Sequence, residues 1–125
     1  MQSNMTKIKP KDVFYIKLGH GGEYAKDCIK TERVKIGFHN VPLSYIEQEM
    51  WNEMLNIFPV TPTSYRNQVK KFALADEHTL WITFHNDKLW WCFAKKPVIE
   101  NPDKSKYKEA VNGWSSKDLL LTFPT

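Results

Sequence analysis

The stretch LWITFHNDKLWWCF, residues 80–93, decides the fold of this chain of 125 residues. Two runs rich in β-branched and aromatic residues, 80–84 and 89–93, flank a short polar segment. Such runs on either side of a polar turn are typical of a β-hairpin. Because neighbouring side chains of a strand point to opposite faces, one of Trp90 and Trp91 is expected in the core and the other outward or in a cleft.

Upstream of the hairpin, strand and helix patterns alternate. The β-rich run 13–18 predicts a first strand, which ends at the glycine-rich segment 19–22. Residues 23–31 are expected to form a short helix, and residues 33–38 alternate apolar and basic positions as a half-buried strand does. The glycine-rich segment is either a tight strand-to-helix turn or a loop whose bare backbone approaches a ligand or a phosphate.

The middle of the chain has the spacing of helices. Apolar residues recur at helical intervals over 42–57, and Ser44 and Glu47 have the spacing of a capping box. Prolines then break the chain before a second helix, which begins at about residue 64 and carries an apolar stripe next to basic residues.

Beyond the hairpin, residues 98–99, short segments between 107 and 114, and the apolar run 119–123 complete the pattern. Strands and helices together predict an α+β fold, a small curved sheet or barrel with two or three helices against it. The length fits one domain, expected over residues 12–125 after a flexible lead-in at 1–11.

The composition combines a basic charge with an excess of aromatic residues. The net charge is +4 and aromatic residues make up 14% of the chain, with five tryptophans. Basic surface together with rings for stacking is how proteins commonly hold single nucleotides. Individually, most of these rings are expected in the core. Burying all five indoles is difficult because each N–H needs a partner, so one or two are expected to line a pocket.

The expected cellular compartment and the expected type of function follow mainly from motifs that the sequence lacks. Cys28 and Cys92 are the only cysteines, and no secretory signal or run of about 20 apolar residues is present, so we expect a soluble, cytoplasmic protein with reduced thiols. The four histidines and two cysteines show no metal-ligand spacing, and no phosphate-binding loop followed by lysine is found. We therefore expect no catalysis, no metal and no cofactor.

Four further stretches form a recognisable series: YIKLGHGGEY at 15–24, VKIGFHNV at 34–41, the segment from YRNQ at 65–68 through TLWITFHNDKLWWCFAK at 79–95, and NGWS at 112–115. Taken in order, they resemble the PUA-like superfamily, especially its EVE and YTH branches, in the form attached to modification-dependent restriction enzymes. The resemblance covers most of the chain. It implies a PUA-like curved sheet or barrel and a module that binds nucleic acid and reads one flipped-out base without catalysis.

The resemblance also assigns residues to the expected site. Phe38 and Trp114 would be the stacking walls, and Tyr15 would form the edge of the base pocket. The other residues expected at that pocket are Lys17, Gly19, His39, Asn40, Trp91 and Ser115. Asn40 and Ser115 would read the polar edge of the base. Phosphate contacts are expected from Lys17, Arg66, Lys70 and Lys71, whose alternative role is ordinary solvated charge.

The resemblance implies a targeting domain of a restriction or defence system, which would act with a nuclease or motor subunit on DNA that carries a modified base. The sequence leaves open whether that base is 5-methylcytosine, 6-methyladenine or a bulkier derivative. Three alternatives also stay open: a reader of modified RNA, a domain that binds a small molecule or a protein, and one part of a larger nuclease or hydrolase. A phosphate-binding reader would lose affinity steeply with added salt, whereas a domain for uncharged ligands would not.

Overall fold

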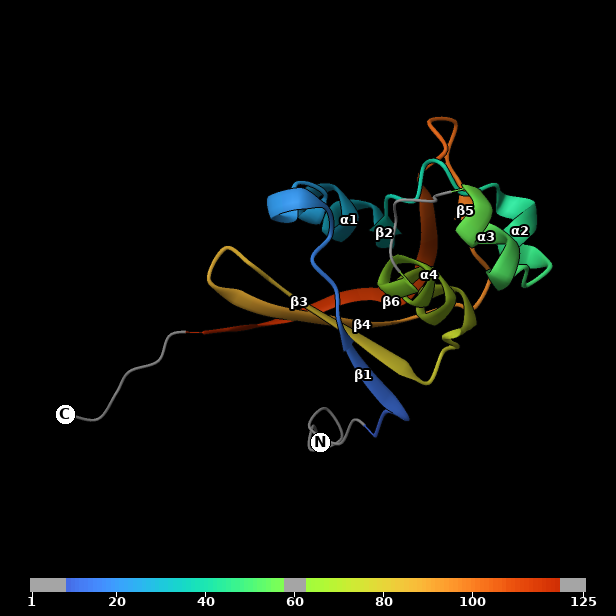
Figure 1. Ribbon diagram of the computed structural model, residues 1–125. Helices are drawn as coiled ribbons and strands as arrows, with labels where there is room; N and C mark the ends of the chain where they lie inside the picture. The colour runs from blue at the N-terminus through green and yellow to red at the C-terminus, as the bar shows by residue number, and fades with distance from the viewer. Residues whose placement is uncertain (1–8, 58–62, 120–125) are drawn as a thin grey trace.

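The computed structural model describes residues 9–57 and 63–119 (Figure 1). Its helices are η2 (His20–Gly22), α1 (Ala25–Thr31), α2 (Leu43–Glu47), α3 (Trp51–Ile57) and α4 (Thr63–Leu74). Its strands are β1 (Asp12–Tyr15), β2 (Arg33–Ile36), β3 (Thr79–His85), β4 (Lys88–Ala94), β5 (Ile99–Glu100) and β6 (Lys106–Asp118). The fold class is α+β, as predicted. None of the helices in the two described ranges is long and apolar enough to cross a bilayer.

A single curved sheet contains all six strands, in the order β1-β3-β4-β6-β2, with β5 also paired to β6. β1 runs parallel to β3, and the other pairings are antiparallel. The long strand β6 pairs with β2 and β5 through its first residues and with β4 through the rest. β1 and β2 end the order and do not pair with each other, so the described sheet is not closed into a barrel.

A bulge bends β6 between its two halves, as Figure 1 shows. The register against β4 shifts between Trp91 and Phe93. Opposite this shift, Asn112 and Gly113 adopt φ of 61° and 72°, a left-handed conformation that asparagine and glycine accept more readily than other residues. The two residues therefore turn one strand through a corner without ending it.

The helices cover one side of the β1–β3–β4 part of the sheet (Figure 1). Along β3, Thr79, Trp81 and Thr83 are buried beneath them, which is the alternation expected of a strand with one covered face. From α4, Val69 and Phe72 enter the same core and are 0% and 1% exposed. This packing explains the apolar stripe predicted for the second helix.

The opposite face of this part of the sheet stays open in the described chain. Val13, Tyr15 and Phe84 are 53%, 58% and 52% exposed. The rings of Tyr15 and Phe84 lie 6.0 Å apart, and Tyr15 stands opposite Ile82, which stands opposite Trp91. These side chains therefore share one face, which is apolar.

Several predictions from local pattern are confirmed. The hairpin forms, with Asn86 and Asp87 at its turn and φ of 54° and 59°, as two-residue turns of the favoured type require. The helix expected at 23–31 is α1. Trp90 and Trp91 lie on opposite faces of the sheet, as expected. Both are half-buried, so neither is the core residue that was expected at one of the two positions. The indole of Trp90 donates to the carbonyl oxygen of His85 at 3.0 Å.

Other expectations are corrected. The single helix expected at 42–57 is two helices, because Glu49 adopts φ of 55° between them. The predicted capping box of Ser44 and Glu47 is wrong, because Pro42 is the N-cap residue of α2 and no side chain caps the helix. The described chain holds four α-helices rather than two or three. The short segments expected between 107 and 114 are one continuous strand, β6, and the first strand ends at Tyr15 because Leu18 has φ of 53°. The expectations for residues 1–8 and 120–123 lie outside the described residues.

Candidate functional site

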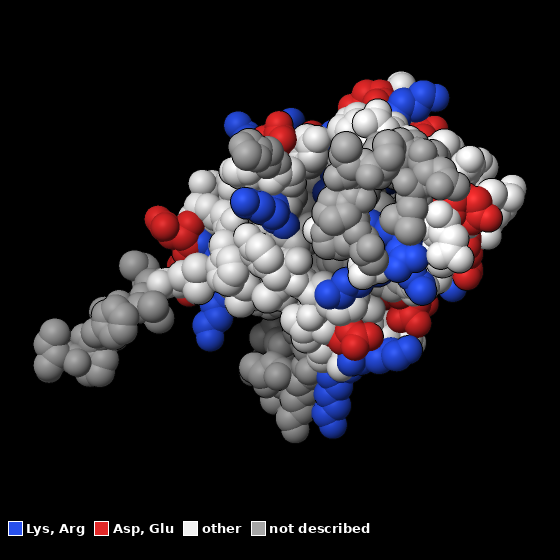
Figure 2. Space-filling model, in the orientation of Figure 1, with Lys and Arg blue, Asp and Glu red and all other residues white. Residues whose placement is uncertain are grey.

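A pocket of about 530 Å³ lies where the ends of β1 and β2 meet α4. Its described walls are residues 14–19, residues 35–37, Gln68, Lys71 and Phe72 of α4, and Trp81 of β3. On the face shown in Figure 2, Lys and Arg side chains lie among Asp and Glu side chains around a largely uncharged area. The volume falls within the range of about 300–1,000 Å³ that is usual for small-molecule sites.

Aromatic rings form the inner part of this pocket. Trp81 is 4% exposed and lies between Phe14 and Phe72, with ring centroids 5.5 and 5.7 Å away. The parallel pairing of β1 with β3 sets Phe14 directly opposite Trp81. Within the described part of the chain, the buried indole N–H of Trp81 has no hydrogen-bond acceptor. Such an unpaired donor is uncommon in native cores, where polar groups are almost always paired.

Three lysines stand around the same pocket: Lys17, Lys35 and Lys71. The Nζ atom of Lys35 lies 4.3 Å above the ring of Tyr24, and that of Lys71 lies 4.0 Å above the ring of Phe14. Burial raises the pKa of Tyr24, so the ring beneath Lys35 is a neutral phenol at neutral pH. Among the described residues, none of the three lysines forms an ion pair with a carboxylate.

A tight connection after β1 forms the edge of the pocket. The amide of Tyr24 donates to the carbonyl oxygen of Leu18 at 2.8 Å, and that of Gly22 donates to the carbonyl oxygen of Gly19 at 3.1 Å. Gly19 has φ of 89°, and a Cβ atom there would lie 2.7 Å from side-chain atoms of Glu23 and Tyr24. The glycine-rich segment is therefore a strand-to-helix turn whose first residue also lines the pocket.

The structure brings some of the residues expected from sequence to this pocket. Tyr15, Lys17 and Gly19 line it, and so does Lys71, which was expected at a phosphate. Phe38 does not line it. Its ring is 6% exposed and packs edge-on against Phe72, with centroids 6.3 Å apart, so it belongs to the core.

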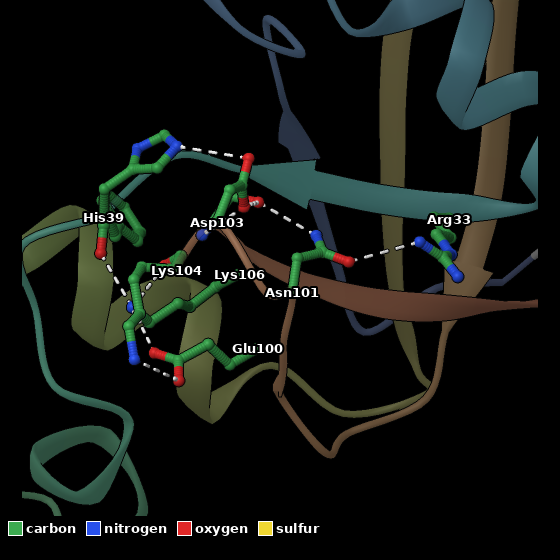
Figure 3. A network of polar contacts seen from close by, with 9 residues as sticks. Arg33, His39, Glu100, Asn101, Asp103, Lys104 and Lys106 are labelled. Carbon is green, nitrogen blue, oxygen red and sulfur yellow. Dashed lines mark hydrogen bonds and ion pairs between the residues drawn. The ribbon is translucent and has the colours of Figure 1, made fainter.

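His39 and Asn40 lie on an exposed turn beside the loop 101–105, as Figure 3 shows for His39. The Nε2 atom of His39 is 3.9 Å from Oδ2 of Asp103. Hydrogen bonds from the hydroxyl and amide of Ser105 hold the pKa of Asp103 below its usual value. This network stabilises a turn, and neither His39 nor Asn40 lines the pocket.

The remaining expected residues also lie elsewhere. The indole of Trp114 donates to the carbonyl oxygen of Arg33 at 2.9 Å, and Trp91 stands opposite Ser115 between β4 and β6. None of these three expected residues lines the pocket. Arg66 donates to the side chains of Asn52 and Asn67 at 3.2 and 3.4 Å, and Lys70 is exposed; neither side chain lines the pocket.

Sequence reasoning missed Phe14, Lys35, Gln68, Phe72 and Trp81 as pocket residues. Phe14 and Lys35 lie within or beside stretches already singled out, so their neighbours gave a partial signal. Gln68 and Trp81 also lie within a quoted stretch, but the place of Trp81 opposite Phe14 depends on the pairing of β1 with β3, which begins more than sixty residues later. Within the described ranges, no three His, Cys, Asp or Glu side chains gather as metal ligands would.

Comparison with known proteins adds no relative. No family model, curated protein or solved structure matches this chain. The functional argument therefore depends on the chemistry of the pocket, since fold alone does not determine function.

Proposed function

We propose that this chain is a nucleic-acid-binding module with a PUA-like fold that holds one flipped-out, modified base of DNA in the pocket between β1, β2 and α4. One observation carries the proposal: aromatic rings and three lysines, none of which forms an ion pair with a carboxylate of the described residues, surround the same pocket of about 530 Å³. Phe14, which is half-buried and lines the pocket, takes the role of a stacking surface that Phe38 and Trp114 were expected to have, and the buried ring of Trp81 supports it from behind.

The energies are compatible with base flipping. Removing a base from its stack costs a few kcal/mol, and least where pairing is already weakened. Stacking on aromatic side chains returns about 1–3 kcal/mol per base, and lysine contacts to phosphate add affinity that does not depend on sequence. A pocket with space for an added methyl group gains about 0.8 kcal/mol for each buried carbon, which favours a modified base.

In this proposal the chain recognises DNA and does not cut it. A nuclease or motor subunit would supply the reaction, and the chain would direct it to modified DNA in a restriction or defence system. The resemblance in sequence to modules attached to such enzymes supports this role.

Fluorescence-anisotropy titrations of short duplexes test the proposal. The duplexes carry unmodified cytosine and adenine, 5-methylcytosine, 5-hydroxymethylcytosine or 6-methyladenine, and each is titrated at two salt concentrations. We expect one modified duplex to bind more tightly than the others, with affinity that falls as salt rises. Equal binding to all duplexes would reduce the function to general nucleic-acid binding, and tighter binding of the matched RNA would replace DNA as the partner.

Phe14 and Phe84 provide a matched pair of variants. Phe14 lines the pocket, whereas Phe84 lies 52% exposed on the open face of the sheet. We expect Phe14→Ala to weaken binding of the preferred duplex by about tenfold, since it removes one stacking surface. Phe84→Ala should leave that affinity unchanged. Circular dichroism checks that both variants fold, and Phe14→Leu provides a better-packed replacement. Equal losses from Phe14→Ala and Phe84→Ala would place the binding site elsewhere.

A further inference from the structure

The three lysines of the pocket come from three separate parts of the chain. Lys17 follows β1, Lys35 belongs to β2 and Lys71 belongs to α4. Four other lysines have an Nζ atom 3.0–4.0 Å from a carboxylate oxygen, namely Lys88, Lys95, Lys104 and Lys106. Lys70 resembles the pocket lysines in having no such partner among the described residues, but it does not line the pocket. Lys17, Lys35 and Lys71 therefore differ from the other lysines in that all three line the same pocket.

Two of these lysines are held in place by aromatic rings. The ammonium groups of Lys35 and Lys71 lie over the rings of Tyr24 and Phe14, at 4.3 and 4.0 Å. A ring face attracts a cation but does not neutralise it, and the attraction is weaker than a charge-assisted hydrogen bond to an anion. An anion that enters the pocket can therefore replace either of these ring contacts at little loss.

Burial divides the pocket into two regions. Trp81 and Phe72 are 4% and 1% exposed and form an apolar inner surface. Lys17 and Lys71 are exposed and Lys35 is half-buried, so the positive charge lies toward solvent. A ligand that fits both regions has a flat aromatic part at one end and a negative charge at the other.

We propose that Lys17, Lys35 and Lys71 form a subsite for the phosphate of the same nucleotide whose base enters the pocket, so that the pocket also binds free nucleoside monophosphates. This inference rests on the proposed function, because it uses the same pocket for the base. It adds that the recognised unit is a whole nucleotide. A free nucleoside lacks the anion and inorganic phosphate lacks the aromatic part, so each makes only half of the contacts.

Isothermal titration calorimetry with the wild-type protein tests this subsite. The ligands are the four common deoxynucleoside 5′-monophosphates, 5-methyldeoxycytidine monophosphate, the matching nucleosides and inorganic phosphate. We expect at least one monophosphate to bind about tenfold or more tightly than its nucleoside, as charge-assisted hydrogen bonds require. We expect inorganic phosphate alone to bind more weakly than that monophosphate.

A double variant, Lys35→Gln with Lys71→Gln, identifies the residues responsible. It should lower the affinity for the monophosphate toward that of the nucleoside, with Lys17 still in place, and change nucleoside binding far less. Lys70→Gln is the control, because Lys70 neighbours Lys71 on α4, is exposed and does not line the pocket. An equal loss from the control would overturn the assignment. If the double variant does not fold, the wild-type comparison of monophosphate with nucleoside decides.

The outcomes separate this inference from the proposed function. One outcome is that duplexes bind in a way that depends on Phe14 while nucleosides and monophosphates bind equally well. That result would overturn the phosphate subsite and support the base pocket. Inorganic phosphate bound as tightly as the monophosphates would indicate an anion site that takes no base. Absence of binding by duplexes, nucleotides and nucleosides alike would overturn both proposals.

Discussion

At the scale of single residues, two buried lysines in β6 differ in how their charge is compensated. Lys106 and Lys108 are both 0% exposed. The Nζ atom of Lys106 lies 3.0 Å from a carboxylate oxygen of Glu100. That of Lys108 donates to the carbonyl oxygen of Ala75 at 2.6 Å and lies 5.3 Å from the ring centre of Phe72. Burial, together with the charge of Lys96, therefore lowers the pKa of Lys108 from 10.5 to about 8, while Asp76 and Glu77 partly oppose this.

This pKa predicts how stability depends on pH. In the unfolded chain Lys108 keeps its proton up to about pH 10.5, whereas in the folded chain it loses it above about pH 8. Between these values the unfolded state binds more protons, so the contribution of Lys108 to the free energy of unfolding rises with pH. We expect Lys108→Met to abolish this rise, which urea unfolding at pH values across the window would measure.

The two thiols act in the opposite direction in the same range. Burial raises the pKa of Cys28 to about 11 and also raises that of Cys92, so both favour the folded state less as pH rises above 9.0. The difference between wild type and Lys108→Met removes their contribution. Parallel curves for the two proteins would contradict the assignment to Lys108.

Glycines 19 and 21 give a second prediction at this scale. Both have positive φ, 89° and 64°, but a Cβ atom at Gly21 would meet no atom within 4 Å, whereas one at Gly19 would lie 2.7 Å from Tyr24. Gly21→Ala should cost about 1–2 kcal/mol through backbone strain alone. Gly19→Ala should cost about 3 kcal/mol, because overpacking adds to that strain. Thermal unfolding compares them, and equal losses would show that the space at Gly19 has no importance.

At the scale of helices and strands, local pattern was sufficient where an element is decided by its own residues. The hairpin, α1 and the apolar stripe of α4 follow from the spacing of apolar residues. Two elements could not be predicted in this way. Glu49 breaks the expected helix at 42–57 although glutamate is a good helix former, and Asn112 and Gly113, which usually mark a turn, form a bulge inside β6. At Glu49 the helix preference of the residue is overridden, whereas Asn112 and Gly113 keep their preferred left-handed conformation but use it inside a strand.

Two lysines lie near the same carboxylate, that of Glu100 in β5, and one is buried whereas the other is exposed. Their contributions to stability can therefore be compared. Lys106 is buried and lies 3.0 Å from Glu100, and its Nζ also donates to the carbonyl oxygen of Phe38 (Figure 3). Lys104 is 68% exposed and lies 4.0 Å from the same carboxylate. Lys106→Met should cost about 3 kcal/mol, since it leaves a partly buried carboxylate without its closest cation. Lys104→Met should cost less than about 1 kcal/mol. Urea unfolding measures both, and similar losses would mean that burial of Lys106 has no effect.

At the scale of the whole molecule, the sequence predicted the kinds of side chain that line the pocket better than it predicted the position of the pocket. Tyr15, Lys17, Gly19 and Lys71 were singled out and do line one pocket. Trp81 could not be found, because only the parallel pairing of β1 with β3 brings it opposite Phe14. That pairing links distant segments, and such links leave no local pattern in a sequence.

The bent strand β6 has a consequence for how the protein is made. It is the last described element, and it alone joins β2 and β5 to β4. A ribosome must therefore release the chain to about residue 118 before the two halves can be connected. Until then β2 and β4 expose backbone groups that β6 later covers, and such edges attract other chains. Synthesis of this chain thus includes an interval in which the edges of β2 and β4 can pair with other chains.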